Sequence, residues 1–419
     1  MNILVIGSGG REHTLFHKLT ESPQADKVYA IPGNPGMGEM TDISVEDNAE
    51  ILRFAKEKEI GLVVVGPEVP LMNGLVDELE SAGIRAFGPR ANAAEIEGSK
   101  SFAKDLMKKY GIPTARYEVF TEAEPARAYI RREGAPIVVK ADGLAAGKGV
   151  IVAMSEQEAL DAVNAIMEDN SFGDAGARVV IEEFMEGEEA SLLAFTDGKT
   201  IRPMISAQDH KRAFDGDKGP NTGGMGTYAP APVMTPEMID RATEEILKPT
   251  LAAMAKEGRS YSGCLYLGLM ITEEGPKVVE FNARFGDPET QVVLPLLDGD
   301  LIQIMCACAD GTLADVPIHW KDGAAVCVVL TAGGYPASYE KGNEIHGIAD
   351  AEKTGALVFH AGTAEKEGKL VTNGGRVLGV VGMGEDIASA VHSAYAAVEK
   401  ISFKDAYYRK DIAHRALHR

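Results

Sequence analysis

Residues 278–291 read VVEFNARFGDPETQ, and this stretch decides how the rest of the chain is interpreted. It predicts a β-strand in which Glu280, Asn282 and Arg284 share one face, because successive side chains of a strand point to opposite sides. Mg²⁺ takes one or two such carboxylate or amide oxygens and completes its shell with nucleotide phosphates and water. An arginine beside them can hold a transferring phosphoryl group. The simpler alternative is an exposed strand face with a charge pair between Glu280 and Arg284.

A glycine-rich stretch earlier in the chain offers lysines to a phosphate group. Residues 138–150 read VVKADGLAAGKGV, which predicts a strand ending at Lys140 and a loop that leads into another strand. The stretch is not a Walker A loop, because that loop runs through Gly-Lys-Ser/Thr into a helix. Glycines allow close backbone approach, so a loop of this kind can fold over a triphosphate whose charge the lysines neutralise. A glycine-rich hairpin on a small domain is the alternative.

A third stretch, residues 179–189, reads VVIEEFMEGEE and predicts a strand that stops at an acidic and aromatic linker. Such a linker can offer backbone groups to an adenine edge and a carboxylate to ribose hydroxyls. Acidic linkers are also common on ordinary surfaces, so this stretch indicates a nucleotide site only in combination with the two stretches described above.

The first strand of the chain runs into the turn GSGGRE at residues 7–12. A dinucleotide-binding fold needs a third glycine where Glu12 stands and an acidic residue at the end of the second strand, and neither is present. The turn therefore predicts an anion site at a helix start, with Arg11 adding charge. A turn that only packs a helix against a sheet is the alternative. Glu68 follows the third strand at the same sheet edge, where doubly wound folds bind ligands.

The order of strands and helices divides the chain into several α/β units. Short β-branched runs at residues 3–6, 27–31, 62–65 and 85–87 predict a doubly wound parallel sheet in an N-terminal domain, residues 1–100. After a linker helix, residues 101–119, we expect a small lid domain at 120–188, a mixed-sheet central domain at 189–324 and a small α+β domain at 325–419. Residues 208–232 have no periodicity, and their length predicts a functional or disordered loop.

Composition places the chain among globular proteins and excludes several classes. Of the 419 residues, 45% are hydrophobic and 25% charged, and the net charge of -21 argues against nucleic acid as a partner. The apolar runs are shorter than the roughly 18 residues of a membrane span, and the first residues lack the features of a signal peptide. We therefore expect a cytoplasmic protein without a membrane partner. The cysteines lack metal-ligand spacing and are expected to be reduced core residues.

Taken together, these elements resemble the ATP-grasp fold: Lys100 on its helix, Lys140, the linker at 182–189 and the Glu280/Asn282 pair follow one another in the usual order. More specific phrases resemble the phosphoribosylamine–glycine ligase family of purine biosynthesis, and this resemblance runs essentially end to end. The phrases are GSGGREH (7–13), KADGLAAGKG (140–149), GPNTGGMG (219–226) and FNARFGDPE (281–289).

The resemblance implies an ATP-dependent carbon–nitrogen ligase with Mg²⁺ or Mn²⁺ as cofactor. Such an enzyme joins 5-phosphoribosylamine to glycine through a glycyl phosphate and gives glycinamide ribonucleotide, ADP and phosphate. The resemblance also implies that Glu280 and Asn282 hold the metal and that Arg284 and Lys140 take part in catalysis. It further implies that the lid closes over ATP to exclude water. The residues expected to bind ATP are Lys100, Lys140, Gly147, Lys148, Glu182, Glu183, Met185 and Glu189. Those expected to bind the other substrates are Gly9, Gly10, Arg11, Glu68, Asp209, Lys211, Asn221, Gly223 and Asp287.

One position departs from the ATP-grasp pattern. Many members carry a second acidic metal ligand on the preceding strand, about twelve residues before the first, and Gly268 stands at that place, so the resemblance does not extend to a full two-metal site. Two rival functions stay open: an ATP-grasp enzyme for another carboxylate or amine, and a regulatory protein that holds ATP without turnover. The second would be expected to lack the lysines or the Glu280/Asn282 pair. We expect a monomer, with a dimer as the alternative.

Overall fold

The computed structural model describes residues 1–145 and 147–419 and begins with a parallel sheet. The β-branched runs form β1 (Asn2–Gly7), β2 (Lys27–Pro32), β3 (Ile60–Val65) and β4 (Ala86–Phe87), in the order β2-β1-β3-β4. Because side chains alternate along β1, Ile3 and Val5 pack into one hydrophobic core and Leu4 and Ile6 into another. This confirms the predicted doubly wound parallel α/β sheet. Its helices are α1 (Gly10–Thr20), α2 (Asn48–Glu57), α3 (Glu68–Met72), α4 (Leu75–Ser81) and α5 (Ala91–Gly98).

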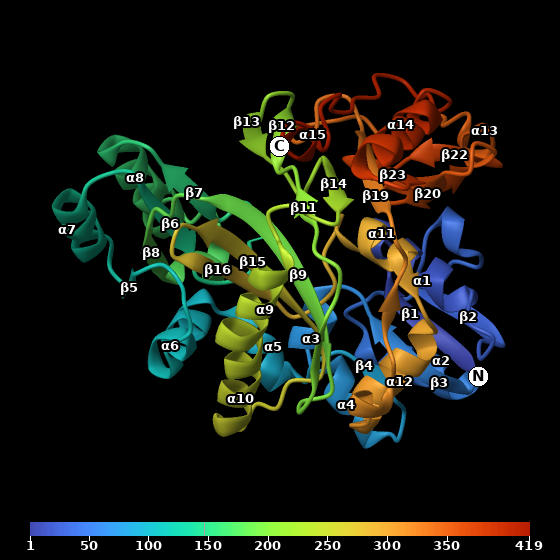
Figure 1. Cartoon of the computed structure of the whole chain (residues 1–419), viewed down its shortest axis with the longest axis horizontal. Coiled ribbons are helices and arrows are strands. Elements are labelled where there is room, and N and C mark those ends of the chain that lie inside the picture. The colour runs from blue at the N-terminus through green and yellow to red at the C-terminus, as the bar shows by residue number, and fades with distance from the viewer. Residues whose placement is uncertain (146) are drawn as a thin grey trace.

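A small unit of mixed α/β structure, called the lid below after the sequence-based expectation, stands apart from the N-terminal sheet (Figure 1). Its antiparallel sheet has the order β5-β8-β6-β7. A hydrophobic core of its own, with Ile130, Val139 and Ile181, lies between this sheet and two helices. A unit with its own core can move as one body. The elements are β5 (Tyr117–Phe120), α7 (Ala123–Glu133), β6 (Ile137–Ala141), β7 (Val150–Ala153), α8 (Glu156–Val163) and β8 (Val179–Glu183). Ala146, in the glycine-rich loop between β6 and β7, lies outside the described residues.

A central antiparallel sheet of order β10-β9-β15-β16 follows the lid. Its strands are β9 (Glu188–Thr196), β10 (Ile201–Pro203), β15 (Gly263–Thr272) and β16 (Gly275–Asn282). Residues 236–256 form a long helix in three parts, which are α9 (Pro236–Ala242), a π-helical segment (Thr243–Leu247) and α10 (Lys248–Lys256). Together with α6 (Lys100–Tyr110), these helices share a core with one face of the N-terminal sheet.

The segment 208–232, predicted as an irregular loop, contains four short strands. They are β11 (Gln208–Asp209), β12 (Arg212–Phe214), β13 (Lys218–Asn221) and β14 (Gly226–Ala229). Strand β14 pairs with β19 (Ala324–Thr331), so β11 and β14 belong to the C-terminal sheet, whose order is β11-β14-β19-β23 (Arg376–Gly384)-β20 (Leu357–His360). Strands β12 and β13 pair with each other as a separate hairpin. The sequence pattern missed these strands because runs of two to four residues, interrupted by glycine and proline, are too short to show a period.

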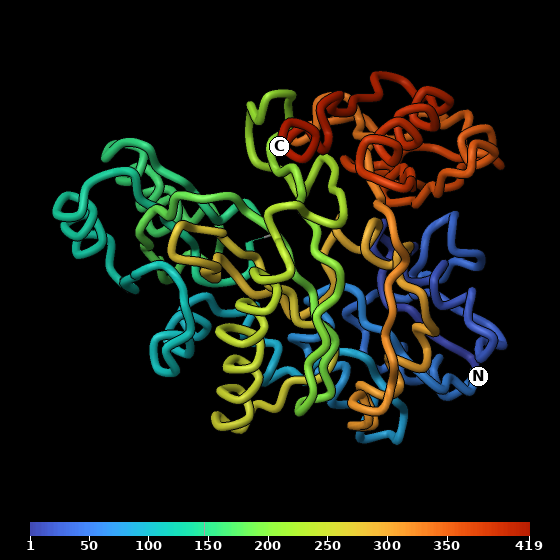
Figure 2. The backbone as a smooth tube through the Cα atoms, in the orientation of Figure 1, coloured from blue at the N-terminus to red at the C-terminus, as the bar shows by residue number. Residues whose placement is uncertain are grey.

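The remaining elements complete the C-terminal domain and tie it to the others. Helix α14 (Ile387–Val398) covers β19 and β23 (Arg376–Gly384), and the backbone trace places this domain above the N-terminal sheet (Figure 2). Helices α11 (Thr290–Val293) and α12 (Leu301–Asp310) run back along the N-terminal domain. The other elements are β17 (Leu297–Asp298), β18 (His319–Trp320), α13 (Ile348–Glu352), β20 (Leu357–His360), β21 (Thr363–Lys366), β22 (Lys369–Thr372) and α15 (His414–Leu417).

Two sequence-based expectations concern the whole chain. Among the residues that the structure describes, no helix combines the length and apolar character needed to cross a membrane. All four cysteines are free, and Cys264, Cys308 and Cys327 are buried, whereas Cys306 is partly exposed.

Candidate active site

A cavity of about 480 Å³ lies where the lid, the central sheet, the N-terminal domain and the segment 208–229 meet. Its size is that of a small-molecule or cofactor site. Most of the residues singled out from the sequence line it, although they come from distant parts of the chain. They are Arg11, Glu68, Lys100, Lys140, Gly147, Glu182, Glu183, Met185, Glu189, Asp209, Lys211, Asn221, Gly223, Glu280, Asn282, Arg284 and Asp287.

Three predicted residues, Gly9, Gly10 and Lys148, are not among the residues that line the cavity. The Gly9 amide donates to Glu12 Oε2 (2.9 Å), and the Arg11 amide donates to Asp287 Oδ2 (3.3 Å). The start of α1 thus holds carboxylates of the protein itself, at the end of the helix where an anion is stabilised. Lys148 is exposed on the lid loop.

Strand β16 presents Glu280 and Asn282 to the cavity. Ala283 is buried in the core on the other side, as the alternation predicts, whereas Phe281 packs into the core and also contributes to the cavity lining. Val279 departs from that pattern and also lines the cavity, because the pairing with β15 shifts register between Gly268 and Leu269. In this pairing Gly268 lies directly opposite Glu280.

Three lysines surround the lid side of the cavity. Lys140 Nζ lies 3.0 Å from Glu182 Oε1, and Lys104 Nζ lies 3.2 Å from Glu182 Oε2, in a buried cluster. Lys100 Nζ donates to the backbone oxygen of Gly143 in the glycine-rich loop (2.9 Å). Burial lowers the pKa of Lys104 to about 8, against the opposing effect of Glu182. Burial also lowers the pKa of Lys100. These cations form a positive region that favours a polyphosphate.

Arg284 is held by two carboxylates. Its Nε lies 3.1 Å from Glu68 Oε2, and its Nη2 lies 2.9 Å from Glu97 Oε1. The alternative reading of this stretch expected Arg284 to pair with Glu280, but Arg284 pairs with Glu68 and Glu97 instead. The guanidinium still borders the cavity, so it can reach a ligand while two carboxylates fix its position.

The oxygens of Glu280 and Asn282 suit a divalent cation that is shared with a nucleotide. Burial raises the pKa of Glu280, but Lys211 and Lys140 outweigh burial and leave the pKa below its ordinary value. Within residues 1–145 and 147–419, no group of three or more His, Cys, Asp or Glu side chains could hold a metal unaided. One carboxylate and one amide fit Mg²⁺, which normally keeps phosphate and water ligands as well.

The segment 208–229 supplies a second charged group on the opposite wall. Asp209 and Lys211 face the cavity, and Lys211 Nζ lies 3.6 Å from Glu189 Oε2. Burial raises the pKa of Asp209 to about 7, although Lys211 opposes the shift. Glu289, which is buried nearby, accepts a hydrogen bond from the Tyr266 hydroxyl (3.0 Å). This wall therefore combines carboxylates with one ammonium group.

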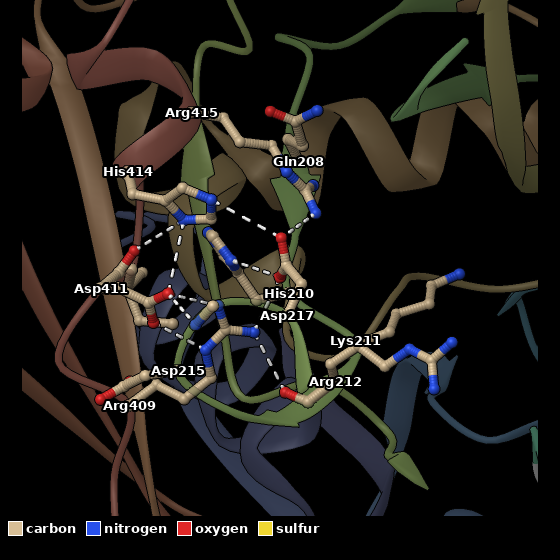
Figure 3. Close-up of polar contacts among 12 residues, drawn as sticks. Gln208, His210, Lys211, Arg212, Asp215, Asp217, Arg409, Asp411, His414 and Arg415 are labelled. Atoms are coloured by element: carbon tan, nitrogen blue, oxygen red, sulfur yellow. Dashed lines mark hydrogen bonds and ion pairs between the residues drawn. The ribbon is translucent and has the colours of Figure 1, made fainter. Parts of the chain in front are cut away.

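The other side of this segment is fixed by the C-terminal tail (Figure 3). His210 points away from Lys211, and its Nε2 accepts a hydrogen bond from the Ala413 amide (3.0 Å). The fully buried Arg409 donates to Asp217 Oδ1 (3.1 Å) and to the backbone oxygen of Arg212 (3.1 Å). It also pairs with Asp411 at 2.7 Å. Figure 2 shows the C-terminus beside the β12–β13 hairpin. The tail thus anchors the segment that carries Asp209 and Lys211.

Several cavity residues were missed in the sequence. Lys104 stands one helical turn after Lys100, so i,i+4 spacing on a helix could have found it. Arg376 reaches the cavity from the C-terminal domain and lies 3.4 Å from Asp287 Oδ1. Glu289 lies in the stretch 281–289, and Glu97 lies three residues before Lys100. No local pattern indicates that their carboxylates point into the cavity.

Family models match nearly the whole chain. The phosphoribosylglycinamide synthetase N domain matches residues 1–97, the ATP-grasp (A) domain of that family matches 98–290, and its C domain matches 325–415. The phosphoribosylamine–glycine ligase of Brucella melitensis is 54% identical over 423 residues, which cover 100% of this chain and 99% of the relative. That of Halalkalibacterium halodurans is 53% identical, covering 100% of this chain and 97% of the relative.

Solved structures show the same arrangement. The phosphoribosylamine–glycine ligase of Thermotoga maritima superposes with a TM-score of 0.86 at 38% identity, covering 99% of this chain and 100% of that one. A biotin carboxylase from Campylobacter jejuni, in a complex described as β-γ-ATP, gives a TM-score of 0.72 at 16% identity, with coverage of 97% and 92%. At that identity the second likeness concerns the fold alone. The multidomain ATP-grasp fold predicted from the sequence is confirmed.

Proposed function

The chain belongs to the phosphoribosylamine–glycine ligase family, and from this premise we propose that the cavity joins 5-phosphoribosylamine to glycine at the expense of ATP. The protein is an ATP-dependent carbon–nitrogen ligase of purine biosynthesis. The observation that carries the assignment of the cavity is the convergence of Lys100, Lys140, Glu280 and Asn282 in one space.

The nucleotide occupies the lid side of the cavity in this proposal. Lys100, Lys140 and the Gly147 loop bind the phosphates, where cations and close backbone approach meet. Backbone groups at Glu183 and Met185 bind the adenine, and Glu189 binds the ribose hydroxyls. Glu182 orients Lys140 through their ion pair. The exposed Lys148 is carried toward the phosphates when the lid closes over ATP and excludes water.

Glu280 and Asn282 hold a divalent metal, Mg²⁺ or Mn²⁺, together with the ATP phosphates. When bound, the metal neutralises charge that builds up on the phosphate oxygens. The chain itself contributes the two oxygen ligands and, through Arg284, a cation next to them whose position Glu68 and Glu97 fix. We propose that Arg284 binds the transferring phosphoryl group.

The proposed reaction has two steps, a phosphoryl transfer and an acyl transfer. A glycine carboxylate oxygen attacks the γ-phosphorus of ATP, ADP leaves, and glycyl phosphate forms. The amine nitrogen of phosphoribosylamine then attacks the carbonyl carbon, phosphate leaves with the bonding electrons, and the nitrogen loses a proton. Asp209, whose pKa of about 7 lies near neutral pH, is suited to accept that proton.

The two other substrates bind on the wall opposite the lid. We assign them to Arg11, Glu68, Asp209, Lys211, Asn221, Gly223 and Asp287, which line this part of the cavity. The phosphate of phosphoribosylamine is proposed to bind near Gly9 and Gly10 at the start of α1. In the structure Glu12 accepts a hydrogen bond from the Gly9 amide, and Asp287 accepts one from the Arg11 amide. Both hydrogen bonds must break before these amides can bind the phosphate.

Phosphate release measured with ATP and metal tests the assignment, with glycine and phosphoribosylamine added singly and together. We expect release above background only when both are present. Alanine and bicarbonate in place of glycine serve as controls, and turnover with either but not with glycine would assign the chain to another ATP-grasp reaction. We also propose that the protein is a cytoplasmic monomer, and sedimentation at micromolar concentration tests the monomer against a dimer.

A further inference from the structure

Glu97 is a buried carboxylate that borders the cavity, and it has partners besides Arg284. It lies in the last turn of α5 and is only 8% exposed. A carboxylate at such a position is costly unless its oxygens receive hydrogen bonds. Its partners therefore indicate what it is for.

Three consecutive residues at and just after the end of β16 donate to this one carboxylate. The Ala283 amide donates to Glu97 Oε2 (2.7 Å). Arg284 Nη2 lies 2.9 Å from Glu97 Oε1. The Asn282 side-chain nitrogen, with the amide in the orientation that satisfies its neighbours, donates to the same Oε1 (3.0 Å) and to the backbone oxygen of Phe281 (3.3 Å). Glu97 thus accepts hydrogen bonds from three neighbouring residues, Asn282, Ala283 and Arg284.

These contacts decide which atom of Asn282 is left for a metal. A primary amide presents an acceptor oxygen on one side and a donor nitrogen on the other, and its neighbours fix the orientation. Because the nitrogen is bound to Glu97, the oxygen is the atom that remains available. A cation requires that oxygen and is repelled by the N–H groups.

We propose that Glu97 is a positioning residue that orients the Asn282 amide for the metal and holds Arg284 beside it. This inference rests on the proposed assignment of Glu280 and Asn282 as metal ligands. Outer residues that bind the ligands of a metal commonly change metal affinity by 10- to 100-fold when they are altered. Glu97→Gln is the sharpest test, because it replaces an acceptor oxygen with an NH₂ group in a place where all three partners are donors.

The experiment measures Mn²⁺ binding to the full-length protein in the presence of ADP, with free Mn²⁺ followed by electron paramagnetic resonance. We expect Glu97→Gln to weaken Mn²⁺ binding by about 10- to 100-fold, and Glu97→Asp, which keeps the charge on a shorter side chain, to weaken it less. In turnover assays, excess metal should restore much of the activity of Glu97→Gln. Glu95→Gln is the matched control, because Glu95 lies on the same helix but pairs with Arg259 outside the cavity.

The outcomes separate this inference from the assignment of the metal site. Weaker Mn²⁺ binding in Glu97→Gln, with Glu95→Gln unchanged, supports the proposal. A lower unfolding temperature with unchanged Mn²⁺ affinity would show a purely structural role and overturn it. If Glu97→Gln does not fold, Glu97→Asp carries the test, and wild-type affinity in that variant overturns the proposal. Glu280→Gln is measured in parallel: if it too binds Mn²⁺ normally, the metal site itself is wrong, whereas a loss confined to Glu280→Gln leaves that site standing.

Discussion

Gly268 lies directly opposite Glu280 in the β15–β16 pair, at the place where many ATP-grasp enzymes carry a second acidic metal ligand. A Cβ atom added to Gly268 would lie 3.0 Å from Glu280 Cγ. Because Gly268 has no side chain, the Glu280 side chain can adopt its position without a steric clash. This relationship links the departure from the wider ATP-grasp pattern to the geometry of the proposed metal site.

The contact predicts that Gly268→Ala disturbs metal binding without removing a ligand. The methyl group must displace the Glu280 side chain by a few tenths of an ångström or more. We expect the Mg²⁺ concentration for half-maximal turnover to rise by roughly 3- to 10-fold, a cost of about 1 kcal/mol, with little change in thermal stability. Gly299→Ala is the control, because the nearest atom to a Cβ there is 4.0 Å away. An unchanged metal requirement in Gly268→Ala would show that Glu280 is not confined in this way.

Lys140 is expected to matter chiefly for ATP. Lys140→Met keeps the apolar stem but removes the charge, and it leaves Glu182 with Lys104 as its remaining cationic partner. A hydrogen bond to a charged group contributes about 1.5–3 kcal/mol, so kcat/KM for ATP should fall by roughly 10- to 100-fold. The comparison is Lys366→Met, since Lys366 is exposed on β21 and does not line the cavity. Steady-state kinetics with ATP varied is the measurement, and an unaltered ATP dependence would remove Lys140 from the nucleotide site.

The parts of the site that could be predicted are those encoded by local patterns. Alternation along residues 280–284 was sufficient to place Glu280 and Asn282 toward a ligand and Ala283 in the core. The doubly wound N-terminal sheet followed equally from short β-branched runs, because parallel strands that are buried on both faces are rich in such residues.

The parts that could not be predicted depend on contacts between distant residues. Glu97 binds a backbone amide 186 positions later, and no spacing rule on α5 indicates that pairing. Strand β14 pairs with β19, far along the chain, and β11 pairs in turn with β14. Val279 reaches the cavity because of a register shift between β15 and β16, and two-residue periodicity does not contain this information.

Asp209 gives a prediction about pH and stability. Burial raises its pKa from 3.8 to about 7, so between these values the folded protein keeps a proton that the unfolded chain has released. The contribution of Asp209 to stability therefore falls as pH rises through this window. As the pH rises from 5 to 8, we expect the free energy of unfolding of Asp209→Asn to increase by roughly 1–3 kcal/mol relative to that of the wild type, at about 1.4 kcal/mol per pKa unit. Urea unfolding at three pH values measures this difference, with the exposed Asp322→Asn as control. Parallel stability curves for the wild type and Asp209→Asn would contradict the assigned shift.

The C-terminal tail is expected to act on substrate binding through the buried Arg409. Its side chain is 0% exposed and binds Asp217, Asp411 and the backbone oxygen of Arg212, so Arg409→Met leaves these partly exposed acceptors without their donor. Losing hydrogen bonds to charged groups costs about 1.5–3 kcal/mol, which should lower the unfolding temperature by several degrees. Because the same cluster anchors the segment that carries Asp209 and Lys211, KM for glycine or phosphoribosylamine should rise more than KM for ATP. The control is Arg415→Met: its side chain is 32% exposed and pairs with Asp217 alone, so the cost should stay below about 1 kcal/mol. Equal effects on all three KM values would indicate general loosening and would separate the tail from the substrate wall.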